Sequence, residues 1–252
     1  MITTVISYCS NDYKFIKKCI DSVVPFSDKV IVTVCNHYFN GEPEDENLIT
    51  KTIAENENEK VKFLHFNYNK DKDIKYWHNF GRYHAIQHLS SISDKSDYIL
   101  FLDADEVVDT KSFIKWSDAA IYNKYDAIVF ECYWYYRDVC YRANTTEIAG
   151  LLIKKDKIKP DSIFTHYERW GMFNAISNGI NHVVSLDNVP MVHHYSWVKT
   201  KDEMLIKTRN WGHNKEKNWT KLIEEEFSHE FNGTDFVHNY TYKKLEEEDK
   251  KS

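Results

Sequence analysis

The sequence contains few of the residues that build small cross-linked or metal-stapled domains. Its 252 residues include five cysteines, an odd number, and no two of them form a Cys-x-x-Cys pair. This usage disfavours a disulfide framework and a structural zinc site, and it fits reduced thiols buried as small apolar side chains. We find no internal repeat, no low-complexity linker and no clear domain boundary.

A long apolar segment and an excess of basic residues are also missing. No run approaches the roughly 18 apolar residues of a membrane-spanning helix, and the formal net charge is −6. An acidic balance disfavours nucleic-acid binding, because phosphate contacts need clustered Lys and Arg. The opening residues MITTVISYCSND lack the basic start and apolar core of a signal peptide. We therefore expect a cytoplasmic protein with no transmembrane segment and no nucleic-acid partner.

The chain does have the composition and pattern of a folded α/β protein. Hydrophobic residues make up 42% and charged residues 29% of it, and 15% are aromatic, with rings that can stack on sugars or bases. Residues 3–7 and 29–35 read as apolar strands, and the segment between them has apolar residues at helical spacing. Near-continuous apolar strands around a helix are typical of a parallel sheet covered on both faces.

The same alternation continues along the chain. Further strands are predicted at 61–66, 98–102, 127–134, 147–153 and 189–196, and helices at 76–90, after Asp109, after the capping box of Thr200 and Glu203, and at 219–231. The strand at 98–102 is apolar throughout and is therefore expected at the centre. We predict a mostly parallel central sheet flanked by helices, with a C-terminal helical extension and a disordered tail over 243–252.

The sharpest feature of the sequence is the segment YILFLDADEVV at 98–108. It delivers Asp103 and Asp105, with Glu106 beside them, to the carboxyl end of a buried strand, where open α/β sheets bind their ligands. Two carboxylates so placed can hold a hard divalent cation, which in turn holds phosphate oxygens. The Asp-x-Asp pattern alone is weak evidence for a metal site, because so short a motif also arises by chance. The alternative is that Asp103 and Asp105 only end the strand or cap a helix. The strand context of the motif favours metal and nucleotide binding.

Three segments together resemble the GT-A-fold glycosyltransferases, which use nucleotide sugars, and most closely their large family 2 group. These segments are VISYCSNDYKFIKKCIDSVVPFSDKVIVTV at 5–34, NFGRYHAI at 79–86 and the acidic strand at 98–108. The resemblance covers roughly residues 1–215. It implies a GT-A (Rossmann-like) catalytic domain over 1–215, in which 1–108 binds the nucleotide sugar and 109–215 binds the acceptor, followed by the extension at 216–252.

The resemblance also implies roles for single residues on the donor side. Asp105 is similar to the direct metal ligand, and Asp103 to a group that contacts the donor ribose or the metal and its water. Arg82 is similar to a donor contact whose guanidinium pairs with a diphosphate, with a surface arginine as the alternative. Ser7 and Tyr8 are placed to contact the base and ribose, although Tyr8 also fits the core. The family usually has an Asp after the second strand, and here Asn36 stands there as a possible base contact.

A late histidine completes the implied metal site. The segment VPMVHHYSWVK at 189–199 carries two neighbouring histidines, which strand alternation sends to opposite faces. We favour His194 over His193 as the ligand. Imidazole suits manganese better than magnesium, so the expected cofactor is a divalent metal ion with Mn²⁺ favoured over Mg²⁺.

The acceptor side is less well defined by the sequence. Inverting transfer needs a carboxylate that takes the proton of the acceptor hydroxyl. Glu168 is our first candidate and Glu147 and Asp187 are its rivals, whereas an ion pair with Arg169 is the other role open to Glu168. Trp134 and Trp170 are predicted acceptor contacts. A His–Lys spacing from His193 to Lys199 occurs in some retaining enzymes, but the N-terminal segment and Arg82 favour inversion.

The expected function is therefore a metal-dependent glycosyltransferase that moves a sugar from a nucleotide-sugar donor, with UDP-sugars favoured, to a glycan or other hydroxyl acceptor. One alternative is a sugar-phosphate nucleotidyltransferase, which the lack of any glycine before Gly41 disfavours. The other is a non-catalytic carbohydrate-binding protein on a decayed transferase fold, which the intact acidic pair and late histidine disfavour. The sequence identifies neither the sugar, nor the acceptor, nor the oligomeric state.

Overall fold

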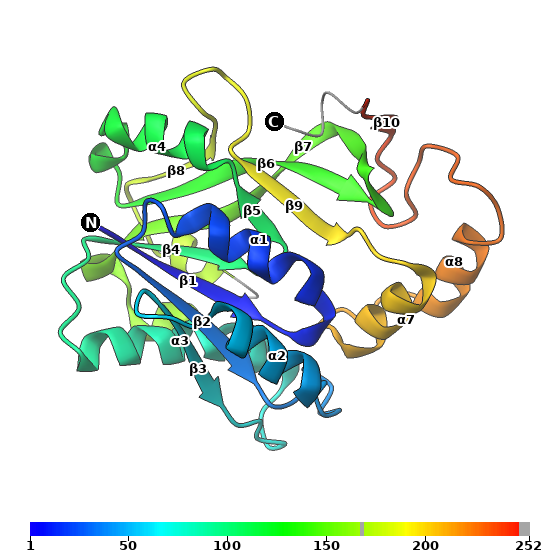
Figure 1. Ribbon diagram of the computed structural model, residues 1–252, viewed down its shortest axis with the longest axis horizontal. Coiled ribbons are helices and arrows are strands. Elements are labelled where there is room, and N and C mark those ends of the chain that lie inside the picture. Colours follow the sequence, from blue (N-terminus) through cyan, green and yellow to red (C-terminus); the bar gives the residue numbers. More distant parts are fainter. Residues whose placement is uncertain (167–168, 247–252) are drawn as a thin grey trace.

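The computed structural model describes residues 1–166 and 169–246, and a single twisted sheet runs through it (Figure 1). Its strand order is β3-β2-β1-β4-β7-β6-β9-β5, with β8 paired to β6 and β10 paired to β7. The strands are β1 (Ile2–Tyr8), β2 (Lys29–Cys35), β3 (Val61–Phe66), β4 (Tyr98–Asp103), β5 (Glu106–Val108), β6 (Ala127–Tyr136), β7 (Asp138–Lys154), β8 (Gly179–Val183), β9 (Val192–Trp197) and β10 (Tyr242–Lys244).

Helices cover both faces of the sheet. They are α1 (Tyr13–Val23), α2 (Glu46–Asn56), α3 (Ile74–Ser91), α4 (Thr110–Asp118), α5 (Pro160–Ile163), α6 (Trp170–Asn174), α7 (Lys201–Asn210) and α8 (Trp219–Glu226). The apolar faces of α1, α2 and α4 pack against one side of the strands, and those of α3, α5 and α6 pack against the other. The predicted α/β class with helices on a mostly parallel sheet is confirmed.

The parallel half of the sheet brings the predicted donor residues to one edge. β1 lies between β2 and β4 and is parallel to both, with Ser7 opposite Thr33 on one side and opposite Asp103 on the other. Nearly every residue of β1 and β4 is buried. These strands are therefore buried on both faces, and Ser7 and Asp103 lie near the point where they end.

The second half of the sheet is mixed and returns the chain to the same edge. β7 is antiparallel to both β4 and β6, whereas β9 runs parallel to β6. The short strand β5 follows directly on the acidic pair and pairs with β9, so that Glu106 lies opposite His194. This pairing joins the two most informative sequence segments, which are almost ninety positions apart in the chain.

The C-terminal residues pack on the sheet more extensively than predicted. Figure 1 shows α7 and α8 beyond the carboxyl ends of β1 and β9. The chain then returns as β10, which pairs antiparallel with β7, and Leu245 is 5% exposed in a cluster with Phe15 and Tyr135. A disordered tail from residue 243 is therefore wrong for residues 243–246, because burial of Leu245 and strand pairing hold them. No helix in the described ranges has the length and apolarity needed to cross a bilayer.

Candidate functional site

A cavity of about 650 Å³ opens at the carboxyl ends of β1, β2 and β4. Most of the predicted site residues line it, namely Ser7, Tyr8, Arg82, Asp103, Asp105, Trp134, Trp170 and His194. Five lining residues come from the segment predicted as an extension after residue 215, namely Glu216, Lys217, Trp219, Val237 and His238. The cavity thus draws its walls from the whole length of the chain.

Asp103 lies at the end of β4 between two guanidinium groups. Arg82 Nη2 is 2.6 Å from its Oδ1, and Arg169 Nη1 is 3.5 Å from its Oδ2. Burial by itself raises the pKa of Asp103, but Arg82 and then Arg169 outweigh it, and the pKa lies below its usual range. The carboxylate is therefore ionised and held by two cations.

Arg82 reaches Asp103 from α3 and is only 3% exposed, so the alternative of a surface arginine is wrong. The preceding residue explains how α3 comes so close. A Cβ at Gly81 would lie 2.8 Å from Thr33 Oγ1 on β2, a distance that real Cβ atoms essentially never show. Glycine at this position lets the helix lie against the strand and carry Arg82 into the cavity.

Glu106 anchors the turn that follows Asp103. Its side chain has no exposed surface, and Arg169 binds it through both nitrogens, at 2.8 Å to Oε2 and 2.5 Å to Oε1. The backbone N–H of Asp103 donates to the same Oε2 at 2.9 Å. Bidentate pairs of this kind are both strong and directional. Arg169, which was considered only as an ion-pair partner of Glu168, thus holds the acidic segment in shape.

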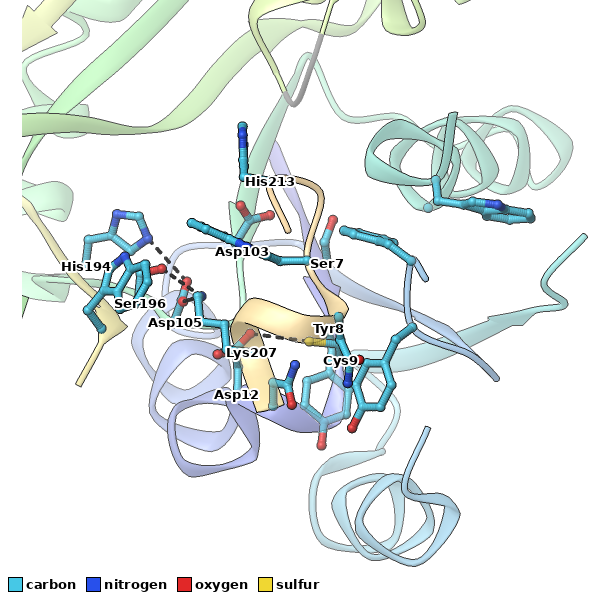
Figure 2. Close-up of a pocket in the computed structure, with 18 of the residues that line it drawn as sticks. Ser7, Tyr8, Cys9, Asp12, Asp103, Asp105, His194, Ser196, Lys207 and His213 are labelled. Carbon is cyan, nitrogen blue, oxygen red and sulfur yellow. Dashed lines mark hydrogen bonds and ion pairs between the residues drawn. The ribbon is translucent and has the colours of Figure 1, made fainter. Parts of the chain in front are cut away.

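Asp105 faces His194 and Lys207 (Figure 2). His194 Nε2 is 3.4 Å from Asp105 Oδ1, and Lys207 Nζ is 3.9 Å from Oδ2. Although burial by itself raises the pKa of Asp105, His194 and then Lys207 hold it well below its usual range. Burial by itself lowers the pKa of His194, but the Asp105 carboxylate outweighs it and raises this pKa above its ordinary value.

His193 lies on the other side of β9, as strand alternation requires. Its Nδ1 is 2.8 Å from the hydroxyl of Tyr135, and burial lowers its pKa to about 4. It does not line the cavity. The structure therefore places His194, and not His193, beside the acidic pair, while the role of His194 as a ligand stays a prediction.

One end of the cavity is aromatic and contains a buried carboxyl group that the sequence did not single out. Phe66, Trp77 and Tyr8 line this end together with Glu44. Glu44 Oε2 accepts from the Ser10 N–H at 2.9 Å and from the Ser10 hydroxyl at 2.5 Å. Burial raises the pKa of Glu44 to about 7 despite these hydrogen bonds. Glu44 lies in an acidic loop, EPEDEN, where nothing in the sequence distinguishes it from its neighbours.

Asn36 does not reach the cavity, so its predicted contact with the base is wrong in this structure. Its side chain is exposed, and its Oδ1 accepts from the backbone N–H of Tyr68 at 2.8 Å. That bond ties the loop after β3 to the end of β2. Tyr8 fits both roles that the sequence left open, since it is 5% exposed, lines the cavity, and bonds Thr52 Oγ1 through its hydroxyl at 2.9 Å.

The other end of the cavity is formed by tryptophans and contains one of the candidate bases. Trp134, Trp211 and Trp219 line it with Glu147 and His238. Glu147 accepts a hydrogen bond from the Tyr240 hydroxyl. Asp187 lies elsewhere: it is 61% exposed and pairs with Lys115 at 2.8 Å, so it is wrong as a base in this site. Glu168 lies outside the described residues.

The metal site of Asp103, Asp105 and His194 stays a prediction, and the contacts of these three residues bear on it. Among residues 1–166 and 169–246, no three Asp, Glu, His or Cys side chains are grouped as ligands for a metal ion. Asp103 is paired with Arg82, His194 Nε2 lies 3.4 Å from Asp105 Oδ1, and the ammonium group of Lys207 lies 3.9 Å from Asp105 Oδ2. With these groups paired to one another and to basic side chains, the described side chains are not arranged as a metal site of Asp103, Asp105 and His194.

No family model matches the chain, and no curated protein matches it. Solved structures with a similar fold include 4-diphosphocytidyl-2C-methyl-D-erythritol synthase, at 9% identity and a TM-score of 0.49, covering 81% of this chain and 96% of that one. A second is S. aureus TarS 1-349 in complex with UDP-GlcNAc, at 13% identity and a TM-score of 0.45, covering 90% of this chain and 73% of that one. A third is the galactosyltransferase LgtC in complex with donor and acceptor sugar analogs, at 12% identity and a TM-score of 0.43, covering 88% of this chain and 95% of that one. At these identities the function has to be argued from the cavity itself.

Proposed function

We propose that this protein is a glycosyltransferase that moves a sugar from a nucleotide-sugar donor to the hydroxyl group of an acceptor. The observation that carries the proposal is the order of groups along one cavity. An aromatic end holding Glu44 is followed by the guanidiniums of Arg82 and Arg169, and then by a tryptophan-lined end holding Glu147. This order matches a base, a diphosphate and a pair of sugars.

The donor is expected to lie with its base among the rings of Tyr8, Phe66 and Trp77. Its diphosphate then reaches the carboxyl ends of β1 and β4, where Arg82 and Arg169 donate N–H groups. Guanidiniums match phosphate oxygens in pairs and stabilise the charge that grows on the leaving group as the glycosidic bond breaks. UDP-sugars are the first donors to test, since the family resemblance favours them.

The acceptor is expected at the tryptophan-lined end, where Trp134 is a predicted contact and indole faces can pack on sugar rings. In the inverting reaction the acceptor oxygen attacks the anomeric carbon, the bond from that carbon to the diphosphate oxygen breaks, and the acceptor proton passes to a carboxylate. Glu147 is the one of the predicted candidate bases that lies among the described residues of the cavity, and it is the carboxylate proposed for this step. Glu168 stays a prediction, as does a cytoplasmic location.

Isothermal titration with nucleoside diphosphates and nucleotide sugars tests the proposal. We expect one nucleotide to bind to the native protein, and Arg82→Lys to weaken that binding about tenfold, because an ammonium group cannot make the paired contacts of a guanidinium. Arg209→Lys, at an exposed position of α7, is the matched control. A folded native protein that binds none of these nucleotides would overturn the proposal.

A further inference from the structure

We propose that the donor diphosphate is bound by three basic side chains of this chain, Arg82, Arg169 and Lys207, and that its binding needs no divalent metal ion. The inference rests on the proposed function and concerns the same site. It assigns a binding role to Lys207, which the sequence did not single out.

The first observation is that every carboxylate oxygen of the acidic segment faces a basic side chain. Both oxygens of Glu106 bind Arg169, those of Asp103 face Arg82 and Arg169, and those of Asp105 face His194 and Lys207. A metal ion entering here would have to displace cations that are covalently part of the protein and already in place. The acidic pair therefore positions cations in this structure.

The second observation is that Lys207 is held inside the cavity. It extends from α7, its side chain is only 11% exposed, and its Nζ donates to the Ser196 hydroxyl at 2.9 Å. The same Nζ lies 6.0 Å and 5.9 Å from the ring centres of Trp197 and Trp211, whose faces attract a cation. Figure 2 shows the ammonium pointing toward Asp105.

The third observation is the distance of Lys207 from its carboxylate. At 3.9 Å from Asp105 Oδ2 the pair is looser than that of Arg82 with Asp103, at 2.6 Å. The ammonium group has three donors, of which Ser196 takes one. Lys207 thus keeps hydrogen-bonding capacity for a phosphate oxygen within the cavity that it lines.

The sum of the charges in the acidic segment and its basic partners also favours nucleotide binding without a metal ion. Three carboxylates, Asp103, Asp105 and Glu106, face three permanent cations, so the cluster is close to neutral before any ligand arrives. A bare group of three carboxylates would repel a diphosphate and would need a bound metal ion to reverse that repulsion. Here a divalent ion would instead meet the positive charges of Lys207 and Arg82.

Titration calorimetry of the native protein with nucleoside diphosphates, in EDTA and in Mn²⁺, tests the inference. We expect a nucleotide to bind in EDTA with an affinity within about twofold of that in Mn²⁺. Binding that appears only when Mn²⁺ is present would overturn the inference while leaving the proposed function standing. Absence of binding in both buffers would overturn the proposed function itself.

Lys207→Met separates the charge of Lys207 from the packing of its side chain, because methionine keeps the length of the apolar stem and removes the charge. In EDTA we expect it to weaken nucleotide binding at least about tenfold. Lys207→Arg should restore most of that loss, and Lys201→Met is the matched control, since Lys201 begins the same helix and pairs with Glu224 on the surface. If Lys207→Met unfolds, Lys207→Arg against Lys201→Met still decides. The role of Lys207 would be refuted if Lys207→Met bound the nucleotide as tightly as Lys201→Met does. It would also be refuted if Lys207→Arg, which keeps the positive charge, lost as much affinity as is expected for removal of the charge, at least about tenfold.

Discussion

Arg169 is the residue on which the shape of the acidic segment depends most. It binds both oxygens of Glu106, which has no exposed surface, and also approaches Asp103. A buried carboxylate that loses its paired cation keeps its desolvation cost without that compensation. The conformation of the segment therefore depends on a residue that lies about sixty positions further along the chain.

Arg169→Met is expected to lower the free energy of unfolding by about 3–5 kcal/mol, the range for breaking a buried ion pair. Chemical denaturation measures the change, with Arg209→Met as a control at an exposed site. A loss below about 1 kcal/mol, the scale of surface pairs, would show that Glu106 does not depend on this partner.

Glu44 predicts a pH dependence of stability. Its pKa is about 7 in the folded protein because of burial, compared with an ordinary value of 4.5. A raised pKa means that the folded state binds the proton more tightly, so the free energy of unfolding falls as pH rises from 4.5 to 7 and is level above that. The size of this fall is roughly 3 kcal/mol, at about 1.4 kcal/mol for each pKa unit.

Glu44→Gln removes the titrating group and should therefore flatten the decline in stability between pH 4.5 and 7. Denaturation curves at several pH values measure it, and Glu42→Gln, at an exposed position of the same loop, is the control. A decline of equal size in Glu44→Gln and in the native protein would assign the effect to other groups.

At the scale of elements, the apolar strands were predictable, whereas the full extent of β7 and the short strands β5, β8 and β10 were not. The run at 98–102 became β4 almost to the residue, because a fully apolar strand has only one environment that suits it. β7 spans Asp138–Lys154, far beyond the predicted 147–153. Its first part is polar and is a strand because β6 and β10 pair with it. Pairing is a tertiary effect that a single segment does not reveal.

Some of the site residues could be predicted to lie close together, and others could not. Ser7 and Asp103 could be placed together because parallel strands end at a common edge. Lys207 and Glu44 could not, since one lies on a helix packed against the cavity from the C-terminal side and the other in a loop. Asn36 was misplaced because its amide binds a neighbouring loop. Side chains delivered by packing carry no local signal of their destination.

The C-terminal strand gives a direct test of the fold at this scale. Leu245→Ala should lower the free energy of unfolding by about 2–5 kcal/mol, the usual cost of truncating a buried leucine, because Leu245 packs with Phe15 and Tyr135. Glu246→Ala, next to it and exposed, should change stability by less than about 0.5 kcal/mol. Equal effects of the two substitutions would contradict the packing of this segment on the sheet.

At the scale of the whole molecule, the net charge is a poor guide to the site. The chain carries a formal charge of −6, yet Arg82, Arg169 and Lys207 all line its main cavity. Because exposed charges are screened over about 10 Å at moderate salt, the acidic surface acts weakly on a ligand inside. Walls drawn from both ends of the chain bring these three basic side chains into one cavity of an acidic protein. The same arrangement places the aromatic side chains around Glu44 and the tryptophans around Glu147 in one cavity.

Release of nucleoside diphosphate from a panel of nucleotide sugars, followed in EDTA and in Mn²⁺ with and without added saccharides, tests the central claim most directly. The account predicts that one donor is consumed, that a saccharide acceptor accelerates the release, and that Glu147→Gln slows it by at least about a hundredfold, as expected for loss of a general base. The claim is contradicted if no nucleotide sugar is consumed by the folded protein, or if pyrophosphate is released from a nucleoside triphosphate and a sugar phosphate instead.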